Sequence, residues 1–475
     1  MTATISSPIA DTTNIERIFD AQQAHYLQVG KTTAGERIAK LRKLEKALFK
    51  YRTEIQEALY ADFQKPALEV DMVEIFVVLS EIRHAIKNLR RWMSPQRVST
   101  PLTLLGSQSY LQYEPKGVVL ILSPWNYPIN LTLSPLVAAI AAGNCAVLKP
   151  SELTPHAAAV MSKLIRELFE EQEVTLLEGG AETAKALLEL PFHHIFYTGS
   201  TAIGKKVMAA AAKNLASVTL ELGGKSPTII DESANLEIAA RRIAWTKFTN
   251  NGQTCIAPDY LLVHESKKEA LLKLLEKYTR QFFGEKAKDS PDYARIVNLH
   301  HFERVKNYLK DATAKGATLA IGGETDADTR FIAPTVLTDV PLHAKVMEEE
   351  IFGPILPLLT FRNLPEAIDL INAKERPLAL YIYSNNQKNI DLILQQTRSG
   401  DVAINHSGLH FFNNDLPFGG VNNSGIGKAH GWFGFEAFSN AKGVFRQTLP
   451  SALELFFPPY NNVKQKMIDL VLKWL

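Results

Sequence analysis

The sequence contains very few cysteines. Only Cys145 and Cys255 occur among its 475 residues. This scarcity rules out a disulfide framework and fits a reducing compartment, because structural disulfides belong mainly to oxidising environments. Any thiol chemistry is therefore confined to two positions. We expect Cys145, which lies in an apolar strand-like run, to be a small buried hydrophobic residue. That leaves Cys255 as the candidate nucleophile.

Long apolar runs and an excess of one charge are also absent. No segment reaches the roughly 18 uninterrupted apolar residues that span a bilayer. The first residues, Met1 to Asp11, are polar and do not resemble a secretory signal. Lysine and arginine number 52 against 50 aspartate and glutamate, a formal net charge of +2. Nucleic-acid-binding proteins usually carry a basic surplus. We therefore expect a cytoplasmic protein with no nucleic-acid partner.

The composition is that of a globular protein, with 46% hydrophobic and 21% charged residues. From Gly117 onward, short apolar strands alternate with helices. Five strands are predicted at Gly117–Leu122, Asn144–Lys149, Val174–Leu177, His194–Thr198 and Ser217–Leu222. Parallel neighbours require crossover connections and helices on both faces, so this pattern predicts a doubly wound parallel sheet.

A second alternating set of seven strands follows Gly223-Gly224, from Pro227–Ile230 to Asp401–Asn405. The sequence therefore predicts two α/β domains of similar size that meet near Leu222. The length of the chain agrees with more than one domain.

The two ends of the chain differ from this pattern. Apolar spacings of three and four predict helices over Glu36–Phe63 and Leu68–Trp92. The segment Gln96–Pro115 is typical of an arm or hairpin. At the C-terminus, Val463–Leu475 has the pattern of a basic amphipathic helix that is too short to cross a bilayer. It lies on a membrane surface, caps a substrate entrance, or packs against the body or a partner subunit.

Polar residues follow several strands of the first predicted sheet, at the edge where open α/β sheets bind ligands. The loop from Gly199 to Gly204 opens a helix, whose N–H groups and dipole suit a pyrophosphate. The alternative for these glycines is tight packing of strand and helix. Lys149 and Glu152 either hold ribose hydroxyls or form a solvated loop pair. Glu221 is either a general base or part of an interdomain ion pair.

Cys255 lies in the polar loop Asn250–Pro258, directly after a predicted helix over Leu236–Phe248. The Asn-Asn-Gly sequence at the start of this loop is typical of a helix C-terminus. A helix C-terminus carries partial negative charge, which raises the pKa of a nearby thiol. Activation of Cys255 is therefore expected from backbone N–H groups or from a bound cationic cofactor.

Several motifs together resemble the NAD(P)-dependent aldehyde dehydrogenase superfamily, from about residue 15 to 450. They are PWNYP (Pro124–Pro128), KPSE (Lys149–Glu152), FYTGS (Phe196–Ser200), ELGGKSP (Glu221–Pro227), NNGQTC (Asn250–Cys255), EEIFGP (Glu349–Pro354) and PFGG (Pro417–Gly420). The short N-terminal region, APDY after the cysteine, HFERV, and the segment Phe457–Tyr460 are similar to the class 3 branch, which acts on fatty or aromatic aldehydes.

The resemblance implies an aldehyde dehydrogenase-like α/β fold with a small β arm for oligomerisation, and hence a homodimer. By this resemblance, residues 1–95 and 116–222 form the Rossmann-type NAD(P)-binding domain and residues 223–435 the catalytic domain. Residues 96–115 and 436–450 form the arm, and residues 451–475 the tail.

The resemblance also implies functional residues. Cys255 is the nucleophile, Glu221 the general base, and Asn126 an oxyanion donor. NAD or NADP is the cofactor, and no metal is expected. The implied cofactor contacts are Trp125, Lys149, Glu152, Gly199, Ser200, Gly204, Leu222, Glu350 and Phe352. Apart from the resemblance, the aromatic residues near these motifs either form a funnel around an apolar aldehyde or are plain core residues: Tyr60, Trp125, Tyr127, Phe411, Phe412 and Phe418. Of these, Tyr127, Phe411 and Phe418 are the expected substrate contacts. Many relatives have a lysine where this chain has Pro135, which leaves the choice between NAD and NADP open.

The expected reaction is oxidation of a medium- or long-chain aliphatic or aromatic aldehyde to a carboxylic acid, through a thioester on Cys255 that Glu221-activated water hydrolyses. Three alternatives remain: a cysteine hydrolase or esterase without redox chemistry, a structural protein, and an acyl-CoA-forming dehydrogenase. The first lacks a histidine near the cysteine loop. The presence of Asn126, Glu221 and Cys255 disfavours the second, and Glu221 disfavours the third.

Overall fold

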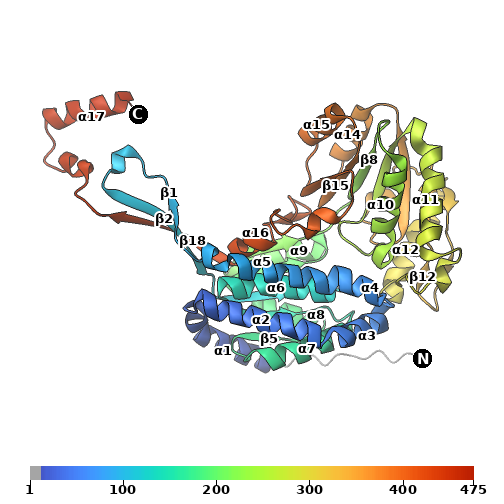
Figure 1. The fold of residues 1–475 in the computed structure, drawn as a ribbon, viewed down its shortest axis with the longest axis horizontal. Helices are drawn as coiled ribbons and strands as arrows, with labels where there is room; N and C mark the ends of the chain where they lie inside the picture. Colours follow the sequence, from blue (N-terminus) through green and yellow to red (C-terminus); the bar gives the residue numbers. More distant parts are fainter. Residues whose placement is uncertain (1–11, 475) are drawn as a thin grey trace.

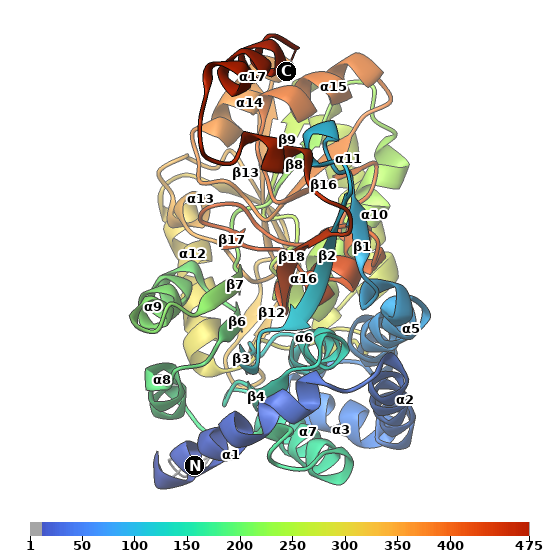
Figure 2. The same cartoon turned by 90° about the vertical axis from the view of Figure 1, so that its left-hand side faces the viewer.

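The computed structural model describes residues 12–474. Two large sheets with helices around them form the body, and a narrow β arm projects from it (Figure 1). Figure 2 shows the N-terminal helices gathered at one end of the molecule and the C-terminal helix at the other. The predicted α/β fold with two open sheets and an arm is confirmed.

The first sheet has six strands in the order β17-β7-β6-β3-β4-β5. Their bounds are β3 (Val118–Leu122), β4 (Cys145–Lys149), β5 (Val174–Leu176), β6 (His194–Thr198), β7 (Ser217–Glu221) and β17 (Gly425–Ile426). The five predicted strands are parallel, and β17 adds an antiparallel edge strand that was not predicted. From β3 the chain adds β4 and β5 on one side, and it then adds β6 and β7 on the other side of β3, so the strand order reverses between β3 and β6. The carboxyl ends of these two strands therefore mark the switch point at which open α/β sheets bind ligands.

Successive side chains of β3 enter two different cores, because side chains alternate across a sheet. Val119 and Ile121 pack with helices α2 (Ala34–Lys50), α5 (Phe76–Trp92), α6 (Pro128–Ala142) and α7 (Pro155–Leu168). Val118 and Leu120 pack with α1 (Thr12–Gly30), α8 (Ala181–Glu189) and α9 (Thr201–Lys213). Cys145 is fully buried in this second core, as expected.

The predicted helix over Glu36–Phe63 is wrong in one respect, because it breaks at Tyr51. It forms α2 (Ala34–Lys50) and α3 (Arg52–Phe63), and Tyr51, with φ −91° and ψ 1°, both ends the first and starts the second. The Tyr51 ring is buried and its hydroxyl donates to the carboxylate of Glu167 on α7. This contact with a distant helix fixes the change of direction.

The predicted helix over Leu68–Trp92 contains an irregularity. It consists of α4 (Ala67–Val70), the π-helical turn η1 (Asp71–Ile75) and α5. A π-turn holds one residue more than an α-helical turn and often occurs at functional sites. Here it carries Glu74, whose side chain is completely buried.

The second sheet has seven strands in the order β10-β13-β14-β9-β8-β15-β16, all parallel except the edge strand β10. Its strands are β8 (Pro227–Ile230), β9 (Tyr260–His264), β10 (Thr318–Ile321), β13 (Thr335–Thr338), β14 (Ile355–Phe361), β15 (Ala379–Tyr383) and β16 (Asp401–Ile404). The main helices around it are α10 (Leu236–Phe248), α11 (Lys268–Phe283), α12 (Leu299–Ala314), α14 (Leu364–Asn372) and α15 (Gln387–Gln396). The seven predicted strands are all present. The small pair β11 (Thr325–Asp326) and β12 (Phe331–Ile332) was not predicted.

The arm is an antiparallel sheet of β1 (Gln96–Val98), β2 (Ser107–Pro115) and β18 (Ser439–Gln447). Strands β2 and β18 pair along their whole length. Helix α17 (Asn462–Trp474) lies beyond the arm, far from the body (Figure 1), and its Val463 side chain is 66% exposed. Among residues 12–474, the helices are all too short or too polar to cross a membrane. The roles assigned to each domain stay predictions.

Candidate active site

The loop that carries Cys255 begins with two asparagines in the left-handed region. Helix α10 ends at Phe248, and Asn250 and Asn251 have φ values of 51° and 55°. Asparagine tolerates this backbone better than other residues that have a Cβ atom. The predicted helix stop before Cys255 is therefore confirmed. The reversal directs Cys255 back toward the loop that follows β3.

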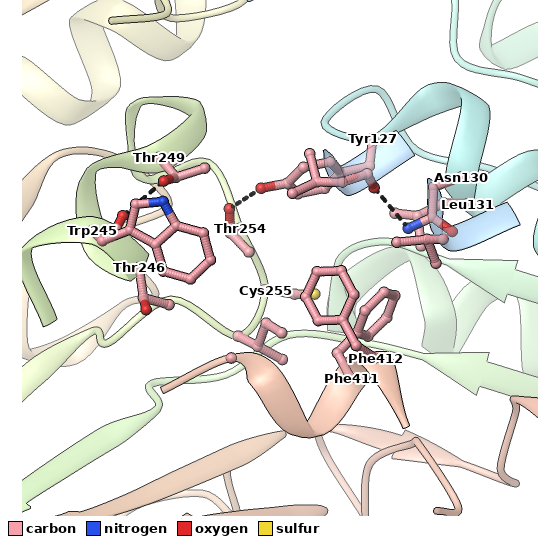
Figure 3. A pocket seen from close by; sticks show the side chains of 14 residues that line it. Tyr127, Asn130, Leu131, Trp245, Thr246, Thr249, Thr254, Cys255, Phe411 and Phe412 are labelled. Atoms are coloured by element: carbon pink, nitrogen blue, oxygen red, sulfur yellow. Dashed lines mark hydrogen bonds between the residues drawn. The ribbon is translucent and has the colours of Figure 1, made fainter. Parts of the chain in front are cut away.

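Cys255 lines a largely apolar pocket (Figure 3). The Tyr127 hydroxyl and Thr254 Oγ1 are 2.7 Å apart at one side of this pocket, and Phe411 and Phe412 lie on another. The remaining lining residues are Val73, Val77, Asn130, Leu131, Trp245, Thr246, Thr249, Ile256 and Gly408. We call this space the outer pocket. Of the predicted substrate contacts, Tyr127 and Phe411 lie in it.

A second, inner cavity shares Cys255 and Phe411 with the outer pocket. Glu221 and Phe418 line it as well, so the structure brings the predicted nucleophile and the predicted general base to one space. Glu221 is only 5% exposed. Neither of its carboxylate oxygens has a hydrogen-bond partner within residues 12–474. The carboxylate has room there because residue 419 is a glycine, which has no Cβ atom. A Cβ atom at Gly419 would lie 2.9 Å from Glu221 Oε1.

Burial dominates the electrostatics of both groups. It raises the pKa of Glu221 to about 8, with Lys428 opposing and Asp401 adding to the effect. Burial, with the nearby carboxylates of Glu350 and Glu221, raises the pKa of the Cys255 thiol to about 12. The backbone N–H groups of Cys255 and Ile256 bond to the sulfur and lower its pKa. A carboxylate with a raised pKa is a more effective base near neutral pH.

Asn126 connects the loop after β3 to the cysteine loop. Its side-chain Nδ2 donates to the carbonyl of Gln253, 3.1 Å away and two residues before Cys255. Its own backbone carbonyl accepts from Asn250 Nδ2 at 2.9 Å. Asn126 is 2% exposed. A side-chain amide carries two N–H groups, so one N–H of Asn126 can still face a reacting oxygen.

The glycine loop after β6 opens helix α9 and lies close to strand β7. Gly199 N–H donates to the Glu221 carbonyl at 3.0 Å, and Ser200 caps helix α9. A Cβ atom at Gly204 would lie 2.7 Å from Leu222 Cδ2, so this glycine allows helix α9 to pack closely on the end of β7. Lys149 and Glu152 form an ion pair of 3.0 Å at the neighbouring strand end.

A groove beside this loop fits the polar part of a dinucleotide. Thr201 at the N-terminus of α9, the pair Gly223-Gly224 and Glu350 all line it. The Gly224 N–H donates to the Glu350 carboxylate, whose pKa burial raises to about 8. A side chain at Gly223 would clash with this carboxylate. These residues fit NAD or NADP, because a helix N-terminus accommodates phosphate and a carboxylate accepts from ribose hydroxyls.

Aromatic residues continue from this groove. The Trp125 ring is 5.3 Å from that of Phe352 and 5.1 Å from that of His301, measured between centroids. Phe352 has a positive φ of 46°. The guanidinium of Arg304 holds this turn by donating to the carbonyl of Ile351 at 3.0 Å.

The structure changes the predicted set of site residues in both directions, by removing one residue and adding others. Tyr60 is 59% exposed and lines neither the outer pocket nor the inner cavity, so its predicted place in the funnel is wrong. The outer pocket is also lined by Trp245, Val73 and Val77. In the sequence these residues show only the ordinary spacing of apolar residues in helices, so nothing marks them as site residues. Glu81 and His430 line the inner cavity, so a histidine shares this space with Cys255. It comes from a segment 175 residues further along the chain.

Comparisons with known proteins agree with this geometry. The model of the aldehyde dehydrogenase family matches residues 2–444. The chain is 46% identical to the 4,4'-diaponeurosporen-aldehyde dehydrogenase of Staphylococcus aureus (strain NCTC 8325 / PS 47) over 450 residues, 94% of this chain and 97% of that protein. It is 45% identical to aldehyde dehydrogenase family 3 member A2 of Rattus norvegicus over 430 residues, 90% of this chain and 88% of that one.

Comparison of the fold with solved structures points to the same family. The solved structure of the substrate-bound state of Staphylococcus aureus AldH superimposes with a TM-score of 0.92 and 43% identity, over 96% of this chain and 99% of that chain. Solved structures of similar fold include complexes with NAD⁺. The comparisons give no support to a hydrolase without redox chemistry. The chain therefore belongs to the aldehyde dehydrogenase family and is an enzyme that oxidises aldehydes with NAD or NADP.

Proposed function

We propose that Cys255 is the nucleophile, Glu221 the general base and Asn126 a donor to the oxyanion in the oxidation of aldehydes to carboxylic acids. One observation carries the proposal: the buried, unpartnered carboxylate of Glu221 lines the same cavity as the Cys255 thiol. A structural carboxylate at this depth would be paired, because an isolated buried charge is costly.

The first half of the reaction uses the cysteine loop. The Cys255 sulfur, as thiolate, attacks the aldehyde carbon and forms a C–S bond, and the carbonyl electron pair moves to oxygen. The free N–H of Asn126 and the Cys255 backbone N–H donate to this alkoxide. A bound NAD⁺ or NADP⁺ supplies the hydride acceptor for the redox step, which leaves a thioester on Cys255.

The second half uses Glu221. Its carboxylate removes a proton from water, whose oxygen attacks the thioester carbon. The C–S bond breaks, the carboxylic acid leaves, and Cys255 recovers its thiolate. Glu221 returns its proton to solvent through the inner cavity. The raised pKa of Glu221 matches this role, because a base works best when its pKa lies near the operating pH.

The remaining site residues divide between cofactor and substrate. We propose that Ser200 and Gly204, at the start of α9, and Gly199 before it frame the pyrophosphate, and that Lys149 and Glu152 hold the adenosine ribose. Glu350, Phe352 and Trp125 lie nearer the nicotinamide, and Leu222 lines its approach. Tyr127, Phe411 and Phe418 contact the substrate. The apolar lining of the outer pocket supports a medium- or long-chain aliphatic or aromatic aldehyde. The Staphylococcus aureus relative is named for 4,4'-diaponeurosporen-aldehyde.

Two substitutions test the chemistry. Cys255→Ser should abolish NAD(P)H formation.

Glu221→Gln should keep the first burst of NAD(P)H, because acylation precedes the step that needs the base, and should slow steady-state turnover by about 10²-fold or more. Stopped-flow absorbance at 340 nm resolves the burst from the steady state. A normal steady-state rate for Glu221→Gln would refute the assignment of Glu221.

We also propose that the arm forms a homodimer and that α17 brings a cytoplasmic enzyme to a membrane surface. The helix carries exposed Val463, Met467 and Leu470 together with Lys464, Lys466 and Lys473, a composition that suits anionic lipid surfaces. Light scattering after size exclusion measures the oligomer.

Deleting residues 461–475 tests the tail. The truncated enzyme should lose binding to vesicles that contain anionic lipid, and with it the activity on long-chain aldehydes, while short-chain aldehydes are oxidised normally. Unchanged vesicle binding and unchanged chain-length selectivity would show that α17 only packs against protein.

A further inference from the structure

A buried ion pair lies beneath the loop that carries Asn126. Lys65 follows α3 and Glu74 belongs to the π-turn η1, and both side chains are fully buried. The distance from Lys65 Nζ to Glu74 Oε1 is 2.7 Å. Removing two charges from water costs several kcal/mol per ion, and a hydrophobic pair of similar volume is often no less stable. The pair therefore needs an explanation other than stability.

Each member of the pair also holds one end of the segment Asn126–Asn130. Lys65 Nζ donates to the backbone carbonyl of Asn126 at 3.0 Å. Glu74 Oε2 accepts the backbone N–H groups of Ile129 at 3.1 Å and Asn130 at 2.9 Å, in the first turn of α6. Helix α6 has no side-chain cap of its own at Tyr127, so Glu74 satisfies donors that the helix leaves unpaired.

The cysteine loop holds the same segment from the opposite side. Asn250 Nδ2 donates to the Asn126 carbonyl, which thus accepts from Lys65 and from Asn250 at once. A carbonyl oxygen has two lone pairs, and both are used here. The Asn126 peptide is therefore fixed between the N-terminal helices and the loop of Cys255.

An aromatic contact continues this arrangement. Lys65 Nζ lies 4.2 Å from the centroid of the Tyr127 ring, and the Tyr127 hydroxyl is hydrogen-bonded to Thr254 Oγ1, next to Cys255. A second buried carboxylate, Glu69, accepts the backbone N–H of Asn250. Lys65 thus lies among the carboxylates of Glu69 and Glu74, the Asn126 carbonyl and the Tyr127 ring. Each of these groups belongs to, or is bonded to, either the Asn126–Asn130 segment or the cysteine loop.

We propose that Lys65 and Glu74 are positioning residues that hold the Asn126 amide at the site of the developing oxyanion. The inference rests on the proposed role of Asn126. A misplacement of about 1 Å can lower the rate by about 10²-fold, and the loss of one oxyanion donor costs about 10²–10³-fold. A purely structural pair would affect only unfolding.

The test uses the full-length double variant Lys65→Met/Glu74→Gln. It removes both charges of the pair, and the amide oxygen of the glutamine side chain keeps an acceptor for the first turn of α6. We expect kcat to fall by about 10–100-fold, with the KM for NAD⁺ within about twofold of wild type. The Cys255-dependent hydrolysis of p-nitrophenyl acetate, which needs no nicotinamide, should fall by the same factor, because it passes through the same oxyanion.

Arg37→Met is the matched control. Arg37 is also a buried cation that contacts α6, but it acts at the opposite end, where its Nη1 donates to the Ala141 carbonyl at 2.9 Å. This variant should melt at a lower temperature and keep wild-type turnover per folded enzyme. Should the double variant fail to fold, Glu74→Asp keeps both charges and shortens the reach by one methylene. It is expected to lower kcat by about 10-fold.

A mutant cycle with Asn126→Ala separates this inference from the proposed function. If Lys65 and Glu74 act through Asn126, the double substitution should lower kcat less than about threefold further in the Asn126→Ala background. Full additivity, or wild-type kcat in a folded double variant or in Glu74→Asp, would overturn the inference. Normal turnover of Asn126→Ala alone would instead refute the proposed role of Asn126.

Discussion

At the scale of single residues, buried carboxylates dominate the site. The carboxylates of Glu221 and Glu350 both act on the Cys255 thiol, and burial raises the pKa of each to about 8. The thiol shares this environment, so its pKa is raised as well. A bound cationic nicotinamide ring would oppose these effects, because an opposite charge favours the ionised form of each group. Bound NAD⁺ or NADP⁺ would thereby favour the thiolate form of Cys255.

The raised pKa of Glu221 predicts a pH dependence. Only the ionised carboxylate acts as a base, so steady-state kcat should rise roughly tenfold for each pH unit below about 8 and then level off. The NAD(P)H burst amplitude should follow a different profile, because it reports acylation of Cys255. Rapid-mixing measurements from pH 6.5 to 9 separate the two. A steady-state kcat that is flat over this range would contradict the prediction.

Candidate site residues that neighbour a motif were predictable from the sequence, whereas those that only the fold brings near were not. Cys255 and Asn126 lie in loops that follow a helix and a strand, and Glu221 is the last residue of β7, all positions where residue type indicates chemistry. Glu81 gives no such signal. It reaches the inner cavity because its carboxylate accepts the backbone N–H of Gly431, 350 residues away, at 3.1 Å.

At the scale of elements, the buried parallel strands were predictable, whereas the irregular helices and the short strands β11, β12 and β17 were not. A strand buried on both faces is a short apolar run, a local property of the sequence. The break at Tyr51 depends on Glu167, and the π-turn places Glu74 at the backbone of α6. Both irregularities depend on contacts with distant segments, which local periodicity does not contain.

The close packing of α9 on β7 leads to a prediction. Gly204→Val would push branched carbon atoms into Leu222, because even a single Cβ atom at that glycine would lie 2.7 Å from the leucine side chain. We expect a loss of about 1–3 kcal/mol in unfolding free energy and weaker cofactor binding, because the start of α9 would shift. Ala209→Val, at an exposed position of the same helix, is the control. Equal melting temperatures and equal cofactor dissociation constants for the two variants would exclude this packing role.

At the scale of the whole molecule, buried acids predict how stability varies with pH. Burial raises the pKa of Glu69 and Glu81 to about 7 and that of Glu221 and Glu350 to about 8. Between pH 4.5 and 8 the folded protein therefore binds more protons than the unfolded chain, and its stability falls as pH rises. His301, His410 and His430, whose pKa values are lowered by burial, act in the opposite direction, but only below about pH 6.5.

The melting temperature should therefore decrease from pH 6.5 to pH 8. Each carboxyl group that remains protonated contributes about 1.4 kcal/mol per pH unit. Differential scanning calorimetry at constant ionic strength measures the change, and Glu81→Gln should reduce its slope because one of the four groups no longer titrates. A melting temperature that rises over this interval would show that these carboxyl groups are ionised in the folded protein.

The π-turn at Asp71–Ile75 also determines how far this enzyme tolerates changes in length. An α-helix advances about 100° per residue, and a π-turn equals an α-helix with one residue inserted. Deleting a single residue from it would make the helix regular and rotate everything before it by that angle relative to α5. Lys65 would then turn away from the Asn126 carbonyl and Glu69 from Asn250, although no catalytic side chain had been altered. In this part of the chain, a shift of one position would be as damaging as the loss of a reacting group.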